Sequence, residues 1–516
     1  MPESERQQQG RASATLTVMT WTLLGKLAGL VRNSLIVAFF GAGVLGDAIQ
    51  AAQAVPMAIN SIVNVGLSTV TVPFFHEYPD DAPRLNAALT RFVVLAHMPL
   101  VLALAIFAPD YLPYMFRSLT PNSVHVASQL VWLFALMLIP LDLTALWTAR
   151  LNATRRFTPL AAANLVRSLS NVIVLVLLHR LGVISTGAAY LAGAALSLLY
   201  MFPSTRPFAP PTKQTRQRAW HAIRLLPTQM TSSVVGQINF LVDKAFAASL
   251  ATGGLVTLSV AGQFLELPVS LFGSSLATVL FPDFAQHAQD KDAQGLIASV
   301  DRALYLTWVA TLPIALLLIG FAVPVTSVVY GYGRFHHGAV LATAAIVAAY
   351  AGSLVFRTMQ QFVARAFFSY KNTRTLAYVS AAFIVLNAVL DYVFMRLMGA
   401  PGIALGTTID GALYFLITLY LLERMLVGRH MVAVRPYLWV LVAAVPIAPL
   451  GLLLSQIGFV HGRLLQFVLV VVGSVVLLTL FLVLLRLLGG PRGRDALRLL
   501  SRVLRAPGRR MSALRR

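Results

Sequence analysis

Long apolar runs separated by short polar segments fill almost the whole chain. About fourteen of them hold roughly 20 residues or more, the length that an α-helix needs to cross a bilayer. By number they are 13–40, 47–75, 86–108, 124–149, 157–179, 181–202, 220–250, 254–284, 302–328, 338–368, 373–397, 401–423, 434–458 and 464–488. The runs lack the alternation of a transmembrane β-strand, and a helix satisfies its own backbone polar groups in lipid. The pattern predicts an all-α membrane protein with about 14 transmembrane helices.

Composition excludes a soluble globular protein, because 58% of the 516 residues are hydrophobic and only 11% are charged. The chain has no cysteine, so it has neither a disulfide framework nor a thiolate metal site. The first apolar run follows a short polar start without a small-residue cleavage site, which indicates a helix that is retained.

Positive charge divides the connecting loops into two alternating sets, and the richer set marks the cytoplasmic side. That set is Arg150, Arg155, Arg156, Arg206, Lys213, Arg216, Arg218, Lys371, Arg374, Arg424, Arg429 and Arg435. An even number of helices then places both termini in the cytoplasm. The tail after Gly490 carries nine Arg, so we expect the net charge of +22 to meet anionic membrane lipids rather than nucleic acid.

The chain contains an internal repeat. The pattern L-x-T-V-x-x-P-x-F begins at Leu67 and again at Leu276, and segments beginning at Ala149 and Ala364 also correspond. Two six-helix halves inserted with the same orientation are expected, an arrangement that suits alternating access. The predicted parts are a lobe at 1–204, a basic linker at 205–219, a second lobe at 220–424, two extra helices within 425–488 and a basic tail at 489–516.

Charged residues inside the apolar runs are candidates for function, since each costs about 2.5–3.5 kcal/mol to place in the bilayer centre. We interpret Lys26, Arg32 and Lys244 as a cationic pocket for phosphate groups. The further candidate site residues are Asp47, Asp243 and Arg357. Internal salt bridges are the alternative for several charges, with Asp243 pairing with Lys244, and Asp391 or Asp410 pairing with Arg357.

Other polar residues and glycines are expected to have structural roles rather than catalytic or ligand-binding ones. Asn164, Asn171 and Asn387 are expected to hydrogen-bond between helices, and the segment from Gly41 to Gly43 to form a tight turn. No hydrolase or metalloenzyme motif is present. We therefore predict a protein that is not an enzyme and has no cofactor.

Several segments resemble the MurJ (MviN) lipid II flippases of the multidrug/oligosaccharidyl-lipid/polysaccharide exporter superfamily. The resemblance extends over most of the chain. The segments that carry it are Gly29 to Arg32, Phe40 to Gly43 with Asp47, Pro56, Val72 to Phe74 with Glu77 and Tyr78, Glu266 to Pro268, Ala277 to Pro282, Tyr330 to Phe335, and Ala366 to Phe368 with Asn372 to Arg374.

The resemblance implies transport of an undecaprenyl-pyrophosphate-linked peptidoglycan precursor (lipid II) from the inner to the outer leaflet of the cell inner membrane. Lys26 and Arg32 match the family's two basic positions on the first helix, and Asp47 matches its acid on the second. The chain departs from the family at Asn33, at Asn60 with Ser61, and at Gly262 with Gln263, where the family has charged residues.

Two alternatives remain open. One is a flippase or exporter for another lipid-linked oligosaccharide or a drug, and the other is a non-transporting cell-wall scaffold. We expect the protein to act as a monomer, with cell-wall synthesis proteins as further partners.

Overall fold

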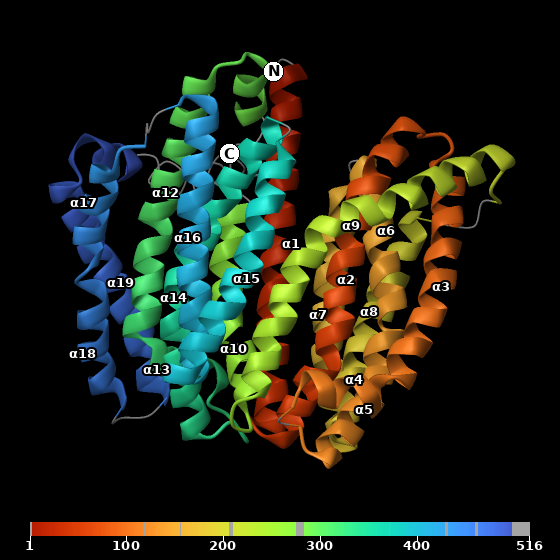
Figure 1. Cartoon of the computed structure of the whole chain (residues 1–516), viewed down its shortest axis with the longest axis horizontal. Coiled ribbons are helices and arrows are strands. Elements are labelled where there is room, and N and C mark those ends of the chain that lie inside the picture. The colour runs from red at the N-terminus through yellow and green to blue at the C-terminus, as the bar shows by residue number, and fades with distance from the viewer. Residues whose placement is uncertain are drawn as a thin grey trace, which may run out of the picture. The chain divides into compact units, whose positions relative to one another are not determined.

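The computed structural model describes residues 3–117, 119–154, 156–205, 210–274, 283–370, 372–428, 432–459 and 463–497 (Figure 1). All regular secondary structure in these residues is helical, which confirms the predicted fold class. Thirteen helical segments of the described chain are long and apolar enough to cross a membrane. The one predicted run without such a segment is 220–250. It lies almost entirely within a helix, but its polar side chains make it less apolar than the other runs.

The chain divides into two compact units. Unit 1 holds residues 1–259 and 332–336, and unit 2 holds residues 260–331 and 337–516. The helices of unit 1 are α1 (Glu3–Phe40), α2 (Val44–Glu77), α3 (Ala82–Ile106), α4 (Ala108–Met115), α5 (Pro121–Leu136), α6 (Leu138–Ala153), α7 (Phe157–Leu178), the short η1 (His179–Leu181), α8 (Ile184–Thr205) and α9 (Lys213–Ala248). Helix α10 (Gly254–Pro268) begins in unit 1 and ends in unit 2.

Unit 1 is a bundle in which α2 packs against α5, α6 and α9, while α7 lies between α1 and α8 (Figure 1). Its core joins side chains from six helices, α2, α3, α6, α7, α8 and α9, among them Phe75, Leu85, Trp147 and Met201. Helix α9 starts at Lys213, inside the predicted linker, because Thr212 caps it by accepting a hydrogen bond from the Thr215 backbone N–H at 3.1 Å.

The turn between α1 and α2 depends on glycine. Gly41 has a positive φ of 72°, as the sequence predicted, and Gly333 in the segment 332–336 has one of 57°. The backbone N–H of Arg334 donates to the carbonyl oxygen of Ala38 at 2.8 Å. A Cβ atom at either glycine would collide with backbone atoms of the opposite segment, so the segment 332–336 closes directly over the end of α1.

Unit 2 continues from α10 through the π-helical η2 (Val269–Ser274). Its remaining described helices are α12 (Ala293–Gly320), α13 (Ala322–Tyr330), α14 (His337–Ser369), α15 (Thr373–Met398), α16 (Ala400–Leu426), α17 (Val434–Ala444), α18 (Ile447–Phe459) and α19 (Arg463–Leu488). Helix α14 packs against both α12 and α16, and α15 packs against α16. In Figure 1, the blue helices α18 and α19 lie side by side, and α18 also contacts α12.

The last helices are fixed to α12 by polar contacts. The Trp308 indole N–H donates to the carbonyl oxygen of Tyr437 at 3.2 Å, and the Tyr437 hydroxyl donates to Asp301 Oδ1 at 2.8 Å. Arg492 forms an ion pair with Asp301 Oδ2 at 3.1 Å. Asp301 is thus shared by α17 and the chain beyond α19.

The outer surface of the helices is apolar, as lipid requires. On α19 the exposed side chains Val468, Val471, Val472 and Val475 follow helical spacing, while Phe481 on the opposite face is buried.

Some predicted features fall outside the described residues. They are residues 275–282, which hold most of the second copy of the repeated pattern, the linker residues 206–209, and the tail from 498 onward. The duplication and the lobe boundaries stay predictions.

Candidate functional site

Arg32 lies on α1 at the contact of α1 with α7 and α8. Its guanidinium carbon is 4.4 Å from the centre of the Tyr190 ring, a cation–π contact. Its Nε donates to Asn33 Oδ1 at 3.0 Å. The Asn171 amide, oriented so that its nitrogen donates to the backbone carbonyls of Arg167 and Ala189, accepts from Arg32 Nη1 at 3.1 Å. Arg32 is therefore held by an aromatic ring and neutral amides.

A second guanidinium lies close to the first. The charge of Arg32 acts on Arg167 of α7, and Arg167 Nη2 donates to Asn164 Oδ1 at 3.1 Å. Neither arginine forms an ion pair with a carboxylate in the described part of the chain. Two positive charges thus share a region of membrane helices without a fixed counter-ion, which is the electrostatic condition for holding an anion.

The position of Asn171 depends on a glycine in α8. A Cβ atom at Gly193 would overlap the end of the Asn171 amide group and lie 2.7 Å from the Arg167 carbonyl oxygen. Only glycine lets α7 and α8 approach this closely. The expectation that Asn171 hydrogen-bonds between helices is confirmed.

Lys26 is half-buried on α1, six residues before Arg32. At helical geometry this spacing is about 9 Å along the axis, which places the two cations at different depths of the same helix.

Asp47 occupies the first turn of α2 and is buried. Its carboxylate accepts hydrogen bonds from the backbone N–H groups of Gly253 at 2.6 Å and Val256 at 3.1 Å. It therefore caps the start of α10, where the helix dipole favours a negative charge. Both carboxylate oxygens are occupied by backbone donors, so the structure gives Asp47 a structural role that the sequence did not predict.

Lys244 on α9 lies in the same neighbourhood and acts electrostatically on Asp47. Its ammonium group is buried and donates to Ser259 Oγ at 2.9 Å and to Gln50 Oε1 at 3.3 Å. No ion pair joins Lys244 to the adjacent Asp243 in the described structure, so the alternative of a salt bridge between these two residues is not supported. Lys244 presents its charge to neutral oxygens.

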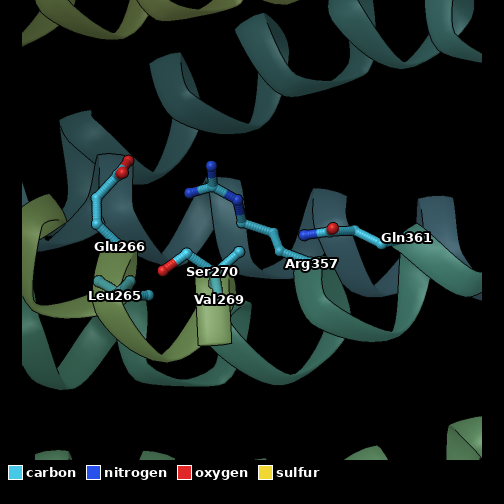
Figure 2. Close-up of a pocket in the computed structure, with 6 residues that line it drawn as sticks. All are labelled: Leu265, Glu266, Val269, Ser270, Arg357 and Gln361. Carbon is cyan, nitrogen blue, oxygen red and sulfur yellow. The ribbon is translucent and has the colours of Figure 1, made fainter. Parts of the chain in front are cut away.

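Arg357 belongs to unit 2, where it lines a pocket of about 130 Å³. The other lining residues are Leu265, Glu266, Val269, Ser270 and Gln361. Figure 2 shows the Arg357 and Glu266 side chains on either side of this space, with Gln361 one turn further along the same helix as Arg357. Neither Asp391 nor Asp410 pairs with Arg357 in the described residues, so its guanidinium is open to the pocket.

The structure thus groups the predicted residues differently from the sequence. Lys26 and Arg32 share α1. Asp47 on α2 and Lys244 on α9 both hydrogen-bond to the first part of α10 or to the residue before it, and Arg357 lies in the other unit. Arg167 is not among the predicted site residues. Its signal was the spacing of Asn164, Arg167 and Asn171, which puts three polar side chains on one face of an apolar helix.

A family model described as lipid II flippase MurJ matches residues 36–473. The lipid II flippase MurJ of Burkholderia cenocepacia is 24% identical over 427 residues, which cover 78% of this chain and 83% of the relative. The probable lipid II flippase MurJ of Thermotoga maritima is 25% identical over 401 residues, covering 77% and 82%.

Solved structures show the same fold. A lipid II flippase MurJ in an inward closed conformation aligns with a TM-score of 0.74 at 22% identity, covering 90% of this chain and 98% of the other. An inward-facing multidrug resistance transporter of the MATE family aligns with a TM-score of 0.61 at 14% identity, covering 80% and 94%.

Proposed function

The chain belongs to the lipid II flippase MurJ family, and we propose that it moves an undecaprenyl-pyrophosphate-linked peptidoglycan precursor from the inner to the outer leaflet by alternating access. The proposal includes the cell inner membrane as its location, with both termini in the cytoplasm. It also assigns substrate-binding roles to Lys26, Arg32, Lys244 and Arg357.

The observation that carries the proposal is the pair of arginines on α1 and α7. Arg32 and Arg167 lie close together, and among the described residues their side-chain partners are amides and an aromatic ring. A diphosphate supplies the negative charge that this pair lacks, and a guanidinium binds phosphate oxygens through paired hydrogen bonds. Arg167 joins the proposed site for this reason, whereas Asp47, whose oxygens already accept backbone hydrogen bonds, supports the site by fixing α10.

The chemistry of the substrate explains why such cations are useful inside a membrane. A diphosphate headgroup does not cross hydrocarbon unaided, because removing its charges from water is too costly. A cationic path lowers that barrier while the polyprenyl tail stays in lipid. With the inside of the cell negative, outward movement of an anion is also favourable by about 2.3 kcal/mol per charge per 100 mV.

Depletion of the protein in growing cells tests the proposal. The fraction of lipid II that an external labelling reagent reaches should fall, and the precursor should accumulate in the inner leaflet. Restoring the wild-type chain should restore the labelled fraction. An unchanged leaflet distribution under depletion would refute flipping and favour the scaffold, while accumulation of a different lipid-linked oligosaccharide would identify the other alternative.

A further inference from the structure

A buried cluster of three polar residues lies in unit 1 apart from the arginines. His97 on α3, Asp142 on α6 and Asn60 on α2 meet inside the bundle, and the exposed fractions of His97 and Asp142 are 5% and 0%. Neither Asp142 nor His97 is among the predicted site residues. Both lie within segments apolar enough to cross a membrane.

The hydrogen bonds of this cluster fix its proton content. The His97 Nδ1 is 2.7 Å from the carbonyl oxygen of Val93, which only accepts, so Nδ1 carries a hydrogen. The His97 Nε2 is 2.6 Å from Asp142 Oδ2, and a hydrogen must lie between these two atoms as well. The Asn60 amide donates to Asp142 Oδ1 at 2.6 Å.

A neutral imidazole next to an ionised carboxylate has one hydrogen too few for this arrangement. The pair therefore holds one additional proton, either on the ring as imidazolium or on Asp142 as a carboxylic acid. With this proton the pair is electrically neutral. Without it, the pair carries one negative charge inside the bundle.

No other charge in the described structure compensates for that loss. Among the described residues, His97 and Asp142 form an ion pair only with each other. Helix α2 contributes the neutral amide of Asn60, and no described titratable side chain of α5, α7, α8 or α9 acts on either residue. Proton release from the closed bundle would leave a buried charge without a counter-ion, which is strongly unfavourable.

The surrounding backbone offers places where the bundle can open. Pro99 interrupts the hydrogen bonding of α3 two residues after His97, and Pro140 lies in the first turn of α6, just after the break between α5 and α6 at Met137. Prolines and helix breaks are the usual positions of bends. Movement of α3 against α6 would admit water to the pair.

We propose that His97 and Asp142 form a proton-binding site whose loading and release are coupled to conformational change during transport. When the helices part, the bond that holds the shared proton breaks and water accepts the proton as hydronium. When they close again, a proton must first be taken from water. The inference rests on the proposed flipping function for its transport consequence, whereas the proton site itself does not.

Flipping by the full chain in liposomes tests the coupling. Lipid II is the probe, and the lipid composition and voltage are held constant while the pH on one side is changed. For one proton per cycle, the distribution of lipid II between leaflets should shift by up to about tenfold per unit of pH difference. Wild-type protein that flips lipid II equally with and without the gradient would overturn the proposal.

The variant Asp142→Asn removes the titration but keeps the geometry. An asparagine amide can donate to a neutral His97 ring and its oxygen can still accept from Asn60. The pH response should be lost in this variant and in His97→Gln, which serves as the second test if the first does not fold. The matched control is His125→Gln, because His125 is an exposed histidine whose ring hydrogen-bonds only to Gln129 among the described residues. A full pH response in Asp142→Asn would overturn the proposal.

Spectroscopy separates failure of this inference from failure of the proposed function. Nitrogen-15 histidine NMR, with His97 assigned by the His97→Gln variant, should show two protonated ring nitrogens. Alternatively, infrared spectroscopy should show a carboxylic acid band that Asp142→Asn removes. A bare ring nitrogen together with an ionised Asp142 would refute the proton site even if lipid II is flipped, whereas a protonated pair in a protein that does not flip lipid II would refute only the transport proposal.

Discussion

Replacing Arg32 by alanine removes the best-defined cation of the candidate site. Its guanidinium uses two donors on Asn33 and Asn171 and is stacked on Tyr190, so further N–H groups are free for a phosphate oxygen. A hydrogen bond to a charged group contributes about 1.5–3 kcal/mol. The loss of that contribution predicts a fall of about 10- to 100-fold in lipid II flipping.

The assay is the rate at which lipid II becomes accessible on the far side of liposomes that contain the purified variant. The flipping rate of Arg32→Lys should lie between those of the wild type and Arg32→Ala, because lysine keeps the charge but not the paired donors. Arg396→Ala is the matched control, since Arg396 also lies over a tyrosine ring, at 5.4 Å from Tyr392, but on an exposed part of α15 in unit 2. If Arg32→Ala flips lipid II as fast as Arg396→Ala, the phosphate role of Arg32 is wrong.

Two further changes test the surroundings of the site, and a third tests a helix cap in unit 2. Gly193→Ala should push Asn171 away from Arg32 and slow flipping about tenfold or more, and an unchanged rate would show that this amide does not position the guanidinium. Asp47→Ala removes the cap of α10 and should lower the free energy of unfolding by about 1–2 kcal/mol, an effect that an unchanged thermal unfolding curve in detergent would exclude. The backbone N–H of Gly295 and the neighbouring His287 hold the pKa of the Asp292 carboxyl below its ordinary value of 3.8. The ionised carboxylate therefore stabilises the fold above pH 3.8. This stabilisation is lost as the pH falls through the lowered pKa. Asp292→Asn should therefore reduce the drop in unfolding temperature on acidification, and an identical acid profile would contradict this role.

The sequence predicted the fold class because the signal for a membrane helix is local. A continuous apolar run in lipid has few alternatives to a helix, and the family resemblance carried by short segments is confirmed by the match over residues 36–473. The same local signal was less reliable for 220–250, where polar side chains of α9, such as Gln237 and Asn239, interrupt the apolar sequence. Packing against α2 and α3 places this helix in the bundle, and packing between helices is not visible in a run of residues.

The site was only partly predictable for a different reason. An intramembrane charge is visible in the sequence, but its partner is not when that partner comes from a distant helix. Asp47 serves the backbone at Gly253 and Val256, and Arg167 joins Arg32 because α7 packs on α1. His97 could not be predicted, because an isolated histidine forms no sequence pattern and its carboxylate partner is 45 residues further along the chain.

The polar contacts between α12 and the last helices have a practical consequence for shortened versions of the protein. A chain that ends before α17 would lose the Tyr437 carbonyl that accepts from the Trp308 indole, as well as the hydroxyl and guanidinium that neutralise and solvate Asp301. These orphaned groups would then face acyl chains, which offer no hydrogen bonds. A shortened protein that lacks the terminal helices should therefore be less stable in the membrane than the full chain.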